Sequence, residues 1–199
     1  MEKRSAPAKI STALRYISLV VWFAVLVAGI VSYLLYPQAF TAANIADFLL
    51  RFQGEIWLVY LAMSAFRGFS LLPSTPLVIA GTMLFPGQPF AVLAVSLTGI
   101  WLSSSMIYFF SDYLGFSDFF EGHKPELTHR IKAKLEHPAG FLFIALWAFF
   151  PLVPTDLVCY LAGTTKMNYR VFIAAVMMGE LILCTFYIFF GGAVLNIVR

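Results

Sequence analysis

Three long apolar runs constrain this chain more than any other feature of its sequence. Residues 16–36 and 90–110 each comprise 21 residues without a charged side chain, and residues 171–195 contain only one, Glu180. A helix of about 20 apolar residues spans the hydrocarbon core of a bilayer. The composition agrees, because 61% of the residues are apolar and only 12% are charged, against about 25% charged in an average soluble domain. The sequence predicts an integral membrane protein and excludes a soluble globular domain.

The polar residues that remain are too few and too scattered to form a nucleic-acid-binding surface, a disulfide framework or a metal site. A net charge of +3 spread between apolar runs makes no basic surface, so we expect no nucleic-acid partner. Cys159 and Cys184 lie inside apolar runs and are expected to be small buried residues rather than a disulfide or metal ligands. His123, His129 and His137 are spaced by six and eight residues, which places them on no single helix face. We therefore expect neither a metal ion nor a cofactor.

The first apolar run is expected to be a retained membrane anchor. It follows four basic residues within residues 1–15, and it is longer than the roughly 7–15 apolar residues of a cleavable signal peptide. The positive-inside rule then predicts a cytoplasmic N-terminus at residues 1–15 and a transmembrane helix at residues 16–36. Residues 40–54 mix polar and apolar side chains and are expected to form an amphipathic helix at the outer interface.

Two further apolar segments, residues 55–85 and 139–163, are each divided into pieces too short to cross a bilayer. Pairs of prolines divide them: Pro73 and Pro76 in the first, Pro151 and Pro154 in the second. Because proline has no backbone N–H, it breaks a continuous helix, and Thr75 is suited to cap a new half-helix that starts at Pro76. Each segment is predicted to be a re-entrant hairpin, buried in protein or lining a wet cavity. The expected structural hinges are Pro73, Pro76, Gly81, Pro151, Pro154 and Gly163.

The two halves of the chain resemble each other. The stretch at residues 73–82 recurs at residues 154–164 with a gap of one residue, and Gly99 lies 80 positions before Gly179. Following the predicted spans through the membrane places the two copies in opposite orientations. The sequence therefore predicts an inverted repeat.

The predicted fold is all-α, with an N-terminal transmembrane helix before an inverted repeat of a re-entrant helical hairpin and a transmembrane helix. Residues 55–199 are expected to form one unit with, in chain order, a re-entrant segment at 55–85, a transmembrane helix at 90–110, a cytoplasmic loop with an amphipathic helix at 112–138, a re-entrant segment at 139–163 and a transmembrane helix at 171–195. Ten of the 13 Lys and Arg residues then lie on the cytoplasmic side, as the positive-inside rule requires.

The matching breaks predict a binding site for an anion. Interrupted hydrophobic segments at corresponding positions of inverted repeats are typical of transporters, whose site lies where the repeats meet. Each break exposes backbone N–H groups at the start of a half-helix, and the helix dipole there attracts negative charge. A lipid phosphate is the natural anion inside a bilayer.

Three ionisable residues lie within the apolar segments. Arg67 is a site candidate because an ion at the bilayer centre costs at least ~2.5 kcal/mol; the alternative is an arginine that snorkels to the interface. Asp156 either caps the N–H groups of a half-helix or handles an ion or proton, and it could pair with Arg67. Glu180 could carry a proton, or it is a neutral, hydrogen-bonded structural residue.

Three stretches of the chain, residues 65–73, 80–87 and 150–163, resemble the VTT-domain membrane proteins, which are also described as SNARE-associated and belong to the DedA superfamily. The resemblance covers about residues 56–196 and is closest to the bacterial branch named for the yeast Tvp proteins. Its most specific part is the pattern Pro-x-x-Pro-x-Asp-Leu-x-x-Tyr-x-Ala-Gly within 150–163. The resemblance implies facing re-entrant loops and movement of phospholipid or polyprenyl-phosphate lipids between leaflets.

The resemblance also assigns positions. Arg67 matches the basic residue ahead of the first hairpin, and the second motif is matched by Pro151, Pro154, Asp156, Tyr160 and Gly163. The chain departs from the family at Ala148, where members often carry arginine. It departs again at Ser74 and Thr75, where DedA proteins proper carry an acidic residue.

The expected function is a lipid transporter or scramblase in a bacterial inner membrane, with membrane lipids as partners and a possible homo-oligomer. The substrate-binding candidates are Arg67, Ser74, Thr75, Thr155, Asp156 and Tyr160, and the proton or ion candidates are Asp156 and Glu180. A membrane scaffold without transport is an alternative. An intramembrane enzyme acting on lipid phosphates is disfavoured because no HExxH motif, nucleophile elbow or metal cluster occurs in the sequence.

The inverted topology predicts opposite accessibility for two positions. A cysteine introduced at Gln88 should react with a membrane-impermeant thiol reagent from outside, whereas one at Lys132 should react only from inside. Labelling of both positions from the same face would contradict the assignment.

Overall fold

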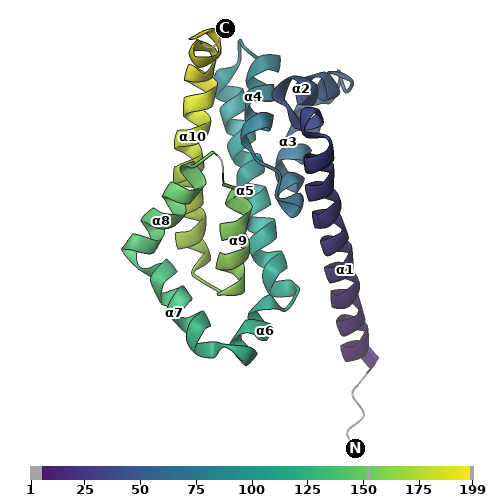
Figure 1. Cartoon of the computed structure of the whole chain (residues 1–199), viewed down its shortest axis with the longest axis vertical. Coiled ribbons are helices and arrows are strands. Elements are labelled where there is room, and N and C mark those ends of the chain that lie inside the picture. The colour runs from purple at the N-terminus through teal and green to yellow at the C-terminus, as the bar shows by residue number, and fades with distance from the viewer. Residues whose placement is uncertain (1–5, 152, 198–199) are drawn as a thin grey trace, which may run out of the picture.

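The computed structural model describes residues 6–151 and 153–197, and every regular element within these ranges is a helix (Figure 1). The elements in chain order are α1 (Ala6–Leu35), η1 (Pro37–Phe40), α2 (Ala42–Leu50), α3 (Ile56–Phe66), η2 (Arg67–Ser70), α4 (Thr75–Leu84), α5 (Pro89–Tyr113), α6 (Phe116–His123), α7 (Pro125–Glu136), α8 (Pro138–Phe149), α9 (Thr155–Thr164) and α10 (Tyr169–Ile197). The predicted all-α class is confirmed for the described residues. Lys3, Arg4 and Arg199, three of the basic residues counted for the topology, lie outside them.

Three helices are long and apolar enough to cross a membrane. They contain the spans Leu14–Leu35 in α1, Pro89–Tyr113 in α5 and Tyr169–Gly191 in α10. These candidate spans overlap the predicted transmembrane helices at 16–36, 90–110 and 171–195. The chain is therefore an integral membrane protein.

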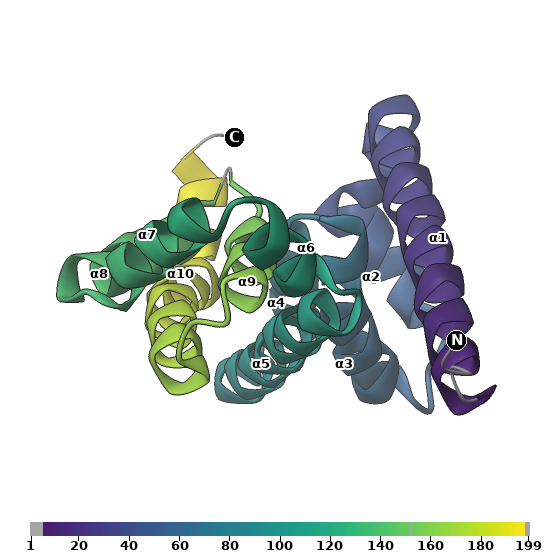
Figure 2. The same cartoon turned by 90° about the horizontal axis from the view of Figure 1, so that it is seen from below.

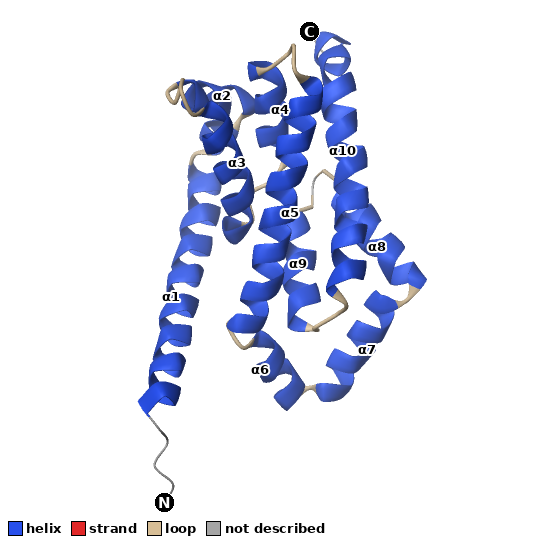
Figure 3. Cartoon of the chain, turned by 180° about the vertical axis from the view of Figure 1, so that it is seen from behind, coloured by secondary structure: helices blue, strands red, loops and turns tan. Residues whose placement is uncertain are grey.

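The two proline-divided segments form pairs of short helices. The members of these pairs, α3 with α4 and α8 with α9, have 10 to 12 residues each. At 1.5 Å per residue, none reaches the roughly 30 Å of a bilayer core. Figures 1 and 3 show that each pair turns back toward the end of the molecule from which it came, and the two pairs come from opposite ends. Both breaks lie between the ends of the long helices α5 and α10.

The details of the first break differ from the prediction by one residue. The N-cap of α4 is Ser74 rather than Thr75, and its side chain makes no capping bond. Its carbonyl instead accepts hydrogen bonds of 3.1 Å from the N–H groups of Leu77 and of Val78. Leu71, just before the break, has a left-handed backbone with φ of 56°, which costs a non-glycine residue about 1–2 kcal/mol. The reversal of the chain therefore begins at Leu71, ahead of the prolines.

Two expected amphipathic segments also differ in extent. The interfacial helix predicted at 40–54 is the shorter α2, which ends at Leu50. Residues 112–138 hold two short helices, α6 and α7, rather than one. Pro125 is the first residue of α7, and because a proline disfavours the helical conformation in the residue before it, α6 ends ahead of it.

Two long helices, α5 and α10, pack on each other and support the short ones. Helix α3 packs on α5 as α8 packs on α10, while α9 packs on α5 and α4 packs on α10. Glycines allow two of these close approaches. Gly99 of α5 lies against Ser64 of α3, and Gly179 of α10 lies against Ala145 and Ala148 of α8.

Helix α1 lies at the side of this bundle (Figure 2), and none of the residues in its most apolar window is buried. It touches the first break, where Gly29 lies against Ser70. It also contacts α9, since the indole N–H of Trp22 donates a 2.6 Å hydrogen bond to the hydroxyl of Tyr160. The anchor helix is therefore held to the bundle at a few points.

Replacing Gly179 with valine should destabilise the bundle. A Cβ at this position would meet the backbone carbonyl of Ala145 and the Cβ of Ala148, and such overpacking costs about 1–3 kcal/mol. Gly191→Val on the same helix is the matched control, because no described atom lies within 4 Å of a Cβ placed there. Thermal unfolding in detergent, followed by circular dichroism, should show a lower midpoint for the first variant only; equal shifts would contradict the close packing.

Candidate functional site

A buried ion pair joins the two breaks. Arg67 begins η2, directly after α3, and Asp156 lies in the first turn of α9. The Nη1 of Arg67 donates to Oδ2 of Asp156 at 3.1 Å and to the backbone carbonyl of Leu72 at 3.0 Å. Only 6% of the Arg67 side chain and 1% of the Asp156 side chain are exposed. The Asp156 carboxylate therefore pairs with a cation from the other half of the chain. It does not cap α9, because the N-cap residue of this helix is Pro154 and no side chain makes a capping hydrogen bond there.

A close backbone approach makes this pair possible. Gly68 follows Arg67, and a side chain there would collide with Ser103 and Ile107 of α5 and with Asp156. Because glycine has no Cβ, η2 can lie directly against α5 and the start of α9. Gly68 therefore sets the distance between the two breaks.

A second buried acid lies beside the pair. Glu180 of α10 is 0% exposed, and its Oε1 accepts a 2.8 Å hydrogen bond from the hydroxyl of Thr155. Three buried polar atoms have no hydrogen-bond partner among the described residues: Ser103 Oγ, Asp156 Oδ1 and Glu180 Oε2. A buried polar group without a partner costs about 1–3 kcal/mol. The cluster therefore has hydrogen-bonding capacity for a water, a proton or a ligand.

The charges of the cluster do not balance when every group is ionised. It contains one cation, Arg67, and two acids, Asp156 and Glu180. An unpaired charge away from water is costly, and such groups are neutralised or paired. One carboxyl must therefore carry a proton, or a further cation must enter.

The other candidates from the sequence lie around this cluster in different ways. Tyr160 is half-buried and bonds to Trp22. Ser74 and Thr75 are half-buried. Gly81 and Gly163 lie inside α4 and α9 rather than at a break, and they allow close packing against Tyr60 and against Tyr108 with Ser111, respectively. The remaining hinge candidates are Pro73, Pro76, Pro151 and Pro154, which border the two breaks.

Two residues of the site were not found from the sequence. In the sequence, Ser103 is one of several small residues of an apolar run, and Trp22 is one of many apolar residues of a membrane anchor. The serines near Gly99, at 96 and 103–105, are the signal in the sequence for a polar face of α5. Trp22 meets its partner across 138 positions of the chain, so no local pattern points to it.

The cysteines lie beside the cluster, whereas His137 lies away from it. Cys159 and Cys184 are free and buried, and the thiol of Cys159 donates a 3.3 Å hydrogen bond to the backbone carbonyl of Thr155. His137 is exposed and accepts a bond from the N–H of Ala139 at the start of α8. Among the described residues, no group of three or more His, Cys, Asp or Glu side chains is arranged to hold a metal ion.

Removing one charge of the buried pair should cost more stability than removing both. Arg67→Met leaves Asp156 without a counter-charge, which we expect to cost about 3–5 kcal/mol, while the double variant Arg67→Met/Asp156→Leu should recover a part. Arg15→Met is the control, because Arg15 pairs with Asp118 at 3.8 Å on an exposed surface, where a pair contributes about 1 kcal/mol or less. Denaturant unfolding in detergent measures the three values. A double variant that is no more stable than Arg67→Met would argue against the pair.

Comparison with known proteins places this chain in a family. The VTT domain family matches residues 72–193, which is more than half of the chain. The match includes α4 to α9 and most of α10, with Asp156 and Glu180, and it begins just after Arg67. No curated protein and no solved structure gives a match. The chain belongs to the VTT-domain family of the DedA superfamily.

Proposed function

We propose that this protein moves lipids with a phosphate headgroup between the two leaflets, as a transporter or scramblase for phospholipids or polyprenyl-phosphate lipids. The observation that carries the proposal is the buried Arg67–Asp156 pair at the meeting point of two broken helices. A headgroup cannot cross hydrocarbon without polar partners. This cluster offers a cation, two acids and unpartnered polar atoms.

We propose that the pairs α3–α4 and α8–α9 are re-entrant hairpins from opposite leaflets and that the chain is an inverted repeat. The exchange of packing partners supports this, because an inverted copy of α3 on α5 is α8 on α10, and an inverted copy of α4 on α10 is α9 on α5. The glycine contacts support it as well. Gly99 against Ser64 corresponds to Gly179 against Ala145, at nearly equal offsets along the chain.

We propose a cytoplasmic N-terminus and a bacterial inner membrane. The start of α1 lies at the same end of the molecule as α6 and α7 (Figure 3), and the exposed pairs of Arg15 with Asp118 and of Lys166 with Asp112 gather there. Basic residues concentrate on the cytoplasmic side of membrane proteins. We also propose that the chain belongs to the Tvp-like branch and that it assembles as a homo-oligomer.

In the proposed mechanism, Asp156 neutralises Arg67 while no lipid is present. An arriving phosphate competes for the guanidinium, and charge-assisted hydrogen bonds to Arg67 compensate the loss of water around the headgroup. The N–H groups at the start of α4 and of α9 supply further positive potential. Thr155, Ser74, Thr75 and Tyr160 are the polar groups available along the path. The hydrocarbon chains stay in the bilayer.

In this mechanism, the carboxylate that the phosphate displaces from Arg67 needs a new positive partner. We propose that Asp156 or Glu180 takes up a proton or a cation when the headgroup binds, which keeps the charge of the cluster constant. The lipid is moved without being chemically altered. The protein is on this view a non-enzymatic carrier.

Loss of the Arg67 charge should stop lipid movement. Purified protein in vesicles with a headgroup-labelled phospholipid should expose the inner-leaflet label to an external quencher, and Arg67→Ala should reduce the rate to that of protein-free vesicles. Arg130→Ala on α7 is the control, because Arg130 is exposed and lies in the polar stretch.

Product analysis of the same vesicles separates the alternatives. Recovery of intact labelled lipid supports movement without chemistry, whereas a chemically altered lipid would indicate an enzyme. If the wild-type protein neither moves nor alters the label, the transport proposal is wrong and a scaffold role remains.

A further inference from the structure

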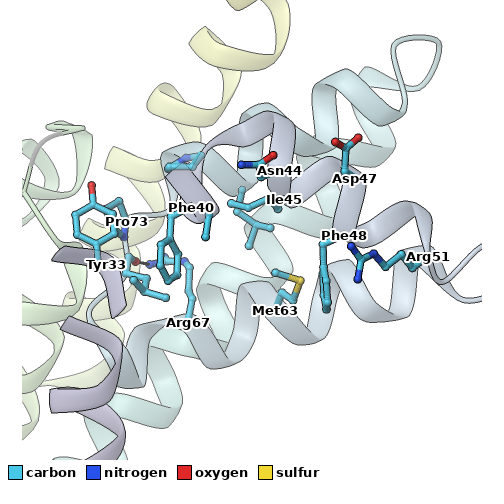
Figure 4. Close-up of a pocket in the computed structure, with 14 residues that line it drawn as sticks. Tyr33, Phe40, Asn44, Ile45, Asp47, Phe48, Arg51, Met63, Arg67 and Pro73 are labelled. Carbon is cyan, nitrogen blue, oxygen red and sulfur yellow. Dashed lines mark hydrogen bonds between the residues drawn. The ribbon is translucent and has the colours of Figure 1, made fainter. Parts of the chain in front are cut away.

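A pocket of about 580 Å³ lies beside the first break. The end of α1, together with η1, α2, α3 and the start of α4, forms its walls (Figure 4). Sites that hold small ligands have volumes of roughly 300–1,000 Å³. Most of its wall is contributed by residues 33–67, which precede the matched VTT domain. The pocket is therefore built largely by the N-terminal part of this chain.

The charged groups of the pocket lie at its two ends, and Asn44 lies between them beside Ile45. Figure 4 shows Arg67 at one end, near Pro73, and Arg51 with Asp47 at the other. Ile45 and Met63 lie between them. Arg51 and Asp47 are exposed, whereas Arg67 is about nine-tenths buried. The pocket thus leads from an exposed polar rim, along an apolar wall, to a buried cation.

At the entry step, Arg67 can bind an anion in this pocket before Asp156 is displaced. Both of its side-chain hydrogen bonds are made by Nη1, and Nε and Nη2 bond to no other described residue. A guanidinium carries five N–H donors in a planar fork and binds phosphate through two parallel bonds. The edge formed by Nε and Nη2 is therefore available to two oxygens of one phosphate.

We propose that this pocket is the entry site for a lipid with a phosphate headgroup, which passes the rim at Arg51 and binds with its phosphate at Arg67. The inference rests on the proposed transport, for which it supplies the port of entry. The rim carries one acid and one base, Asp47 and Arg51, with no net formal charge, so the buried Arg67 is the end that retains the anion. The apolar wall covers the lipid hydrocarbon next to the headgroup. Inorganic phosphate has no such hydrocarbon.

The test is a binding measurement rather than a transport assay. The full-length protein in detergent is titrated with dioleoyl phosphatidic acid, and bound lipid is counted by native mass spectrometry. Met63→Trp should raise the dissociation constant by about tenfold or more, because the larger side chain occupies the pocket. Leu58→Trp is the matched control on the same helix, since Leu58 is 62% exposed and lies outside the pocket.

Two further binding measurements show which chemical groups of the ligand the pocket requires. Dioleoylglycerol, which lacks the phosphate, should bind more weakly than phosphatidic acid, and inorganic phosphate should not displace the lipid. Ala39→Trp, which narrows the pocket from η1, replaces Met63→Trp if that variant unfolds at a lower temperature than the control.

Several results would overturn the inference: equal affinities of the Met63→Trp and Leu58→Trp variants, equal binding of the two lipids, or displacement by phosphate alone. The outcome is independent of the vesicle assay. If the pocket binds lipid but the protein moves no lipid between leaflets, only the transport proposal is contradicted. If the Met63→Trp variant still moves lipid at the wild-type rate, only the proposed entry site is contradicted.

Discussion

The rest of the structure depends on the contact between Arg67 and Asp156. Each residue stands at a break in a helix too short to cross a membrane, and each charge alone would be costly in apolar surroundings. Pairing at 3.1 Å makes the two breaks mutually dependent, because neither can move away without exposing the other's charge. The positions of η2 and of the start of α9 follow from this single requirement.

The two long helices provide the frame that this contact needs. Helices α5 and α10 pack on each other, and each supports one short helix from either half. Gly68 brings the first break against α5, and Ser103 of that helix adds a polar atom to the cluster. Glu180 reaches the same cluster from α10 through Thr155. Uninterrupted helices thus hold broken ones.

Much of this arrangement could be predicted from the sequence, because the strongest signals were local. The length of the apolar runs gave the three spans, the prolines gave the two breaks, and isolated charges pointed to Arg67 and Asp156. The capping residue of α4 was misplaced by one position, because the backbone turns at Leu71 before the proline pair. The role of Ser103 and the pocket between α1, α2 and α3 depend on distances between remote segments, so no local pattern could predict them.

The most direct test of this account is an experimental structure of the protein in a lipid bilayer, in which the distance from Arg67 Nη1 to Asp156 Oδ2 is measured. The account predicts a hydrogen-bonded pair near 3.1 Å, with both breaks at one depth in the interior of the membrane. An Arg67 side chain turned toward the lipid, or the two atoms more than about 4 Å apart, would contradict it.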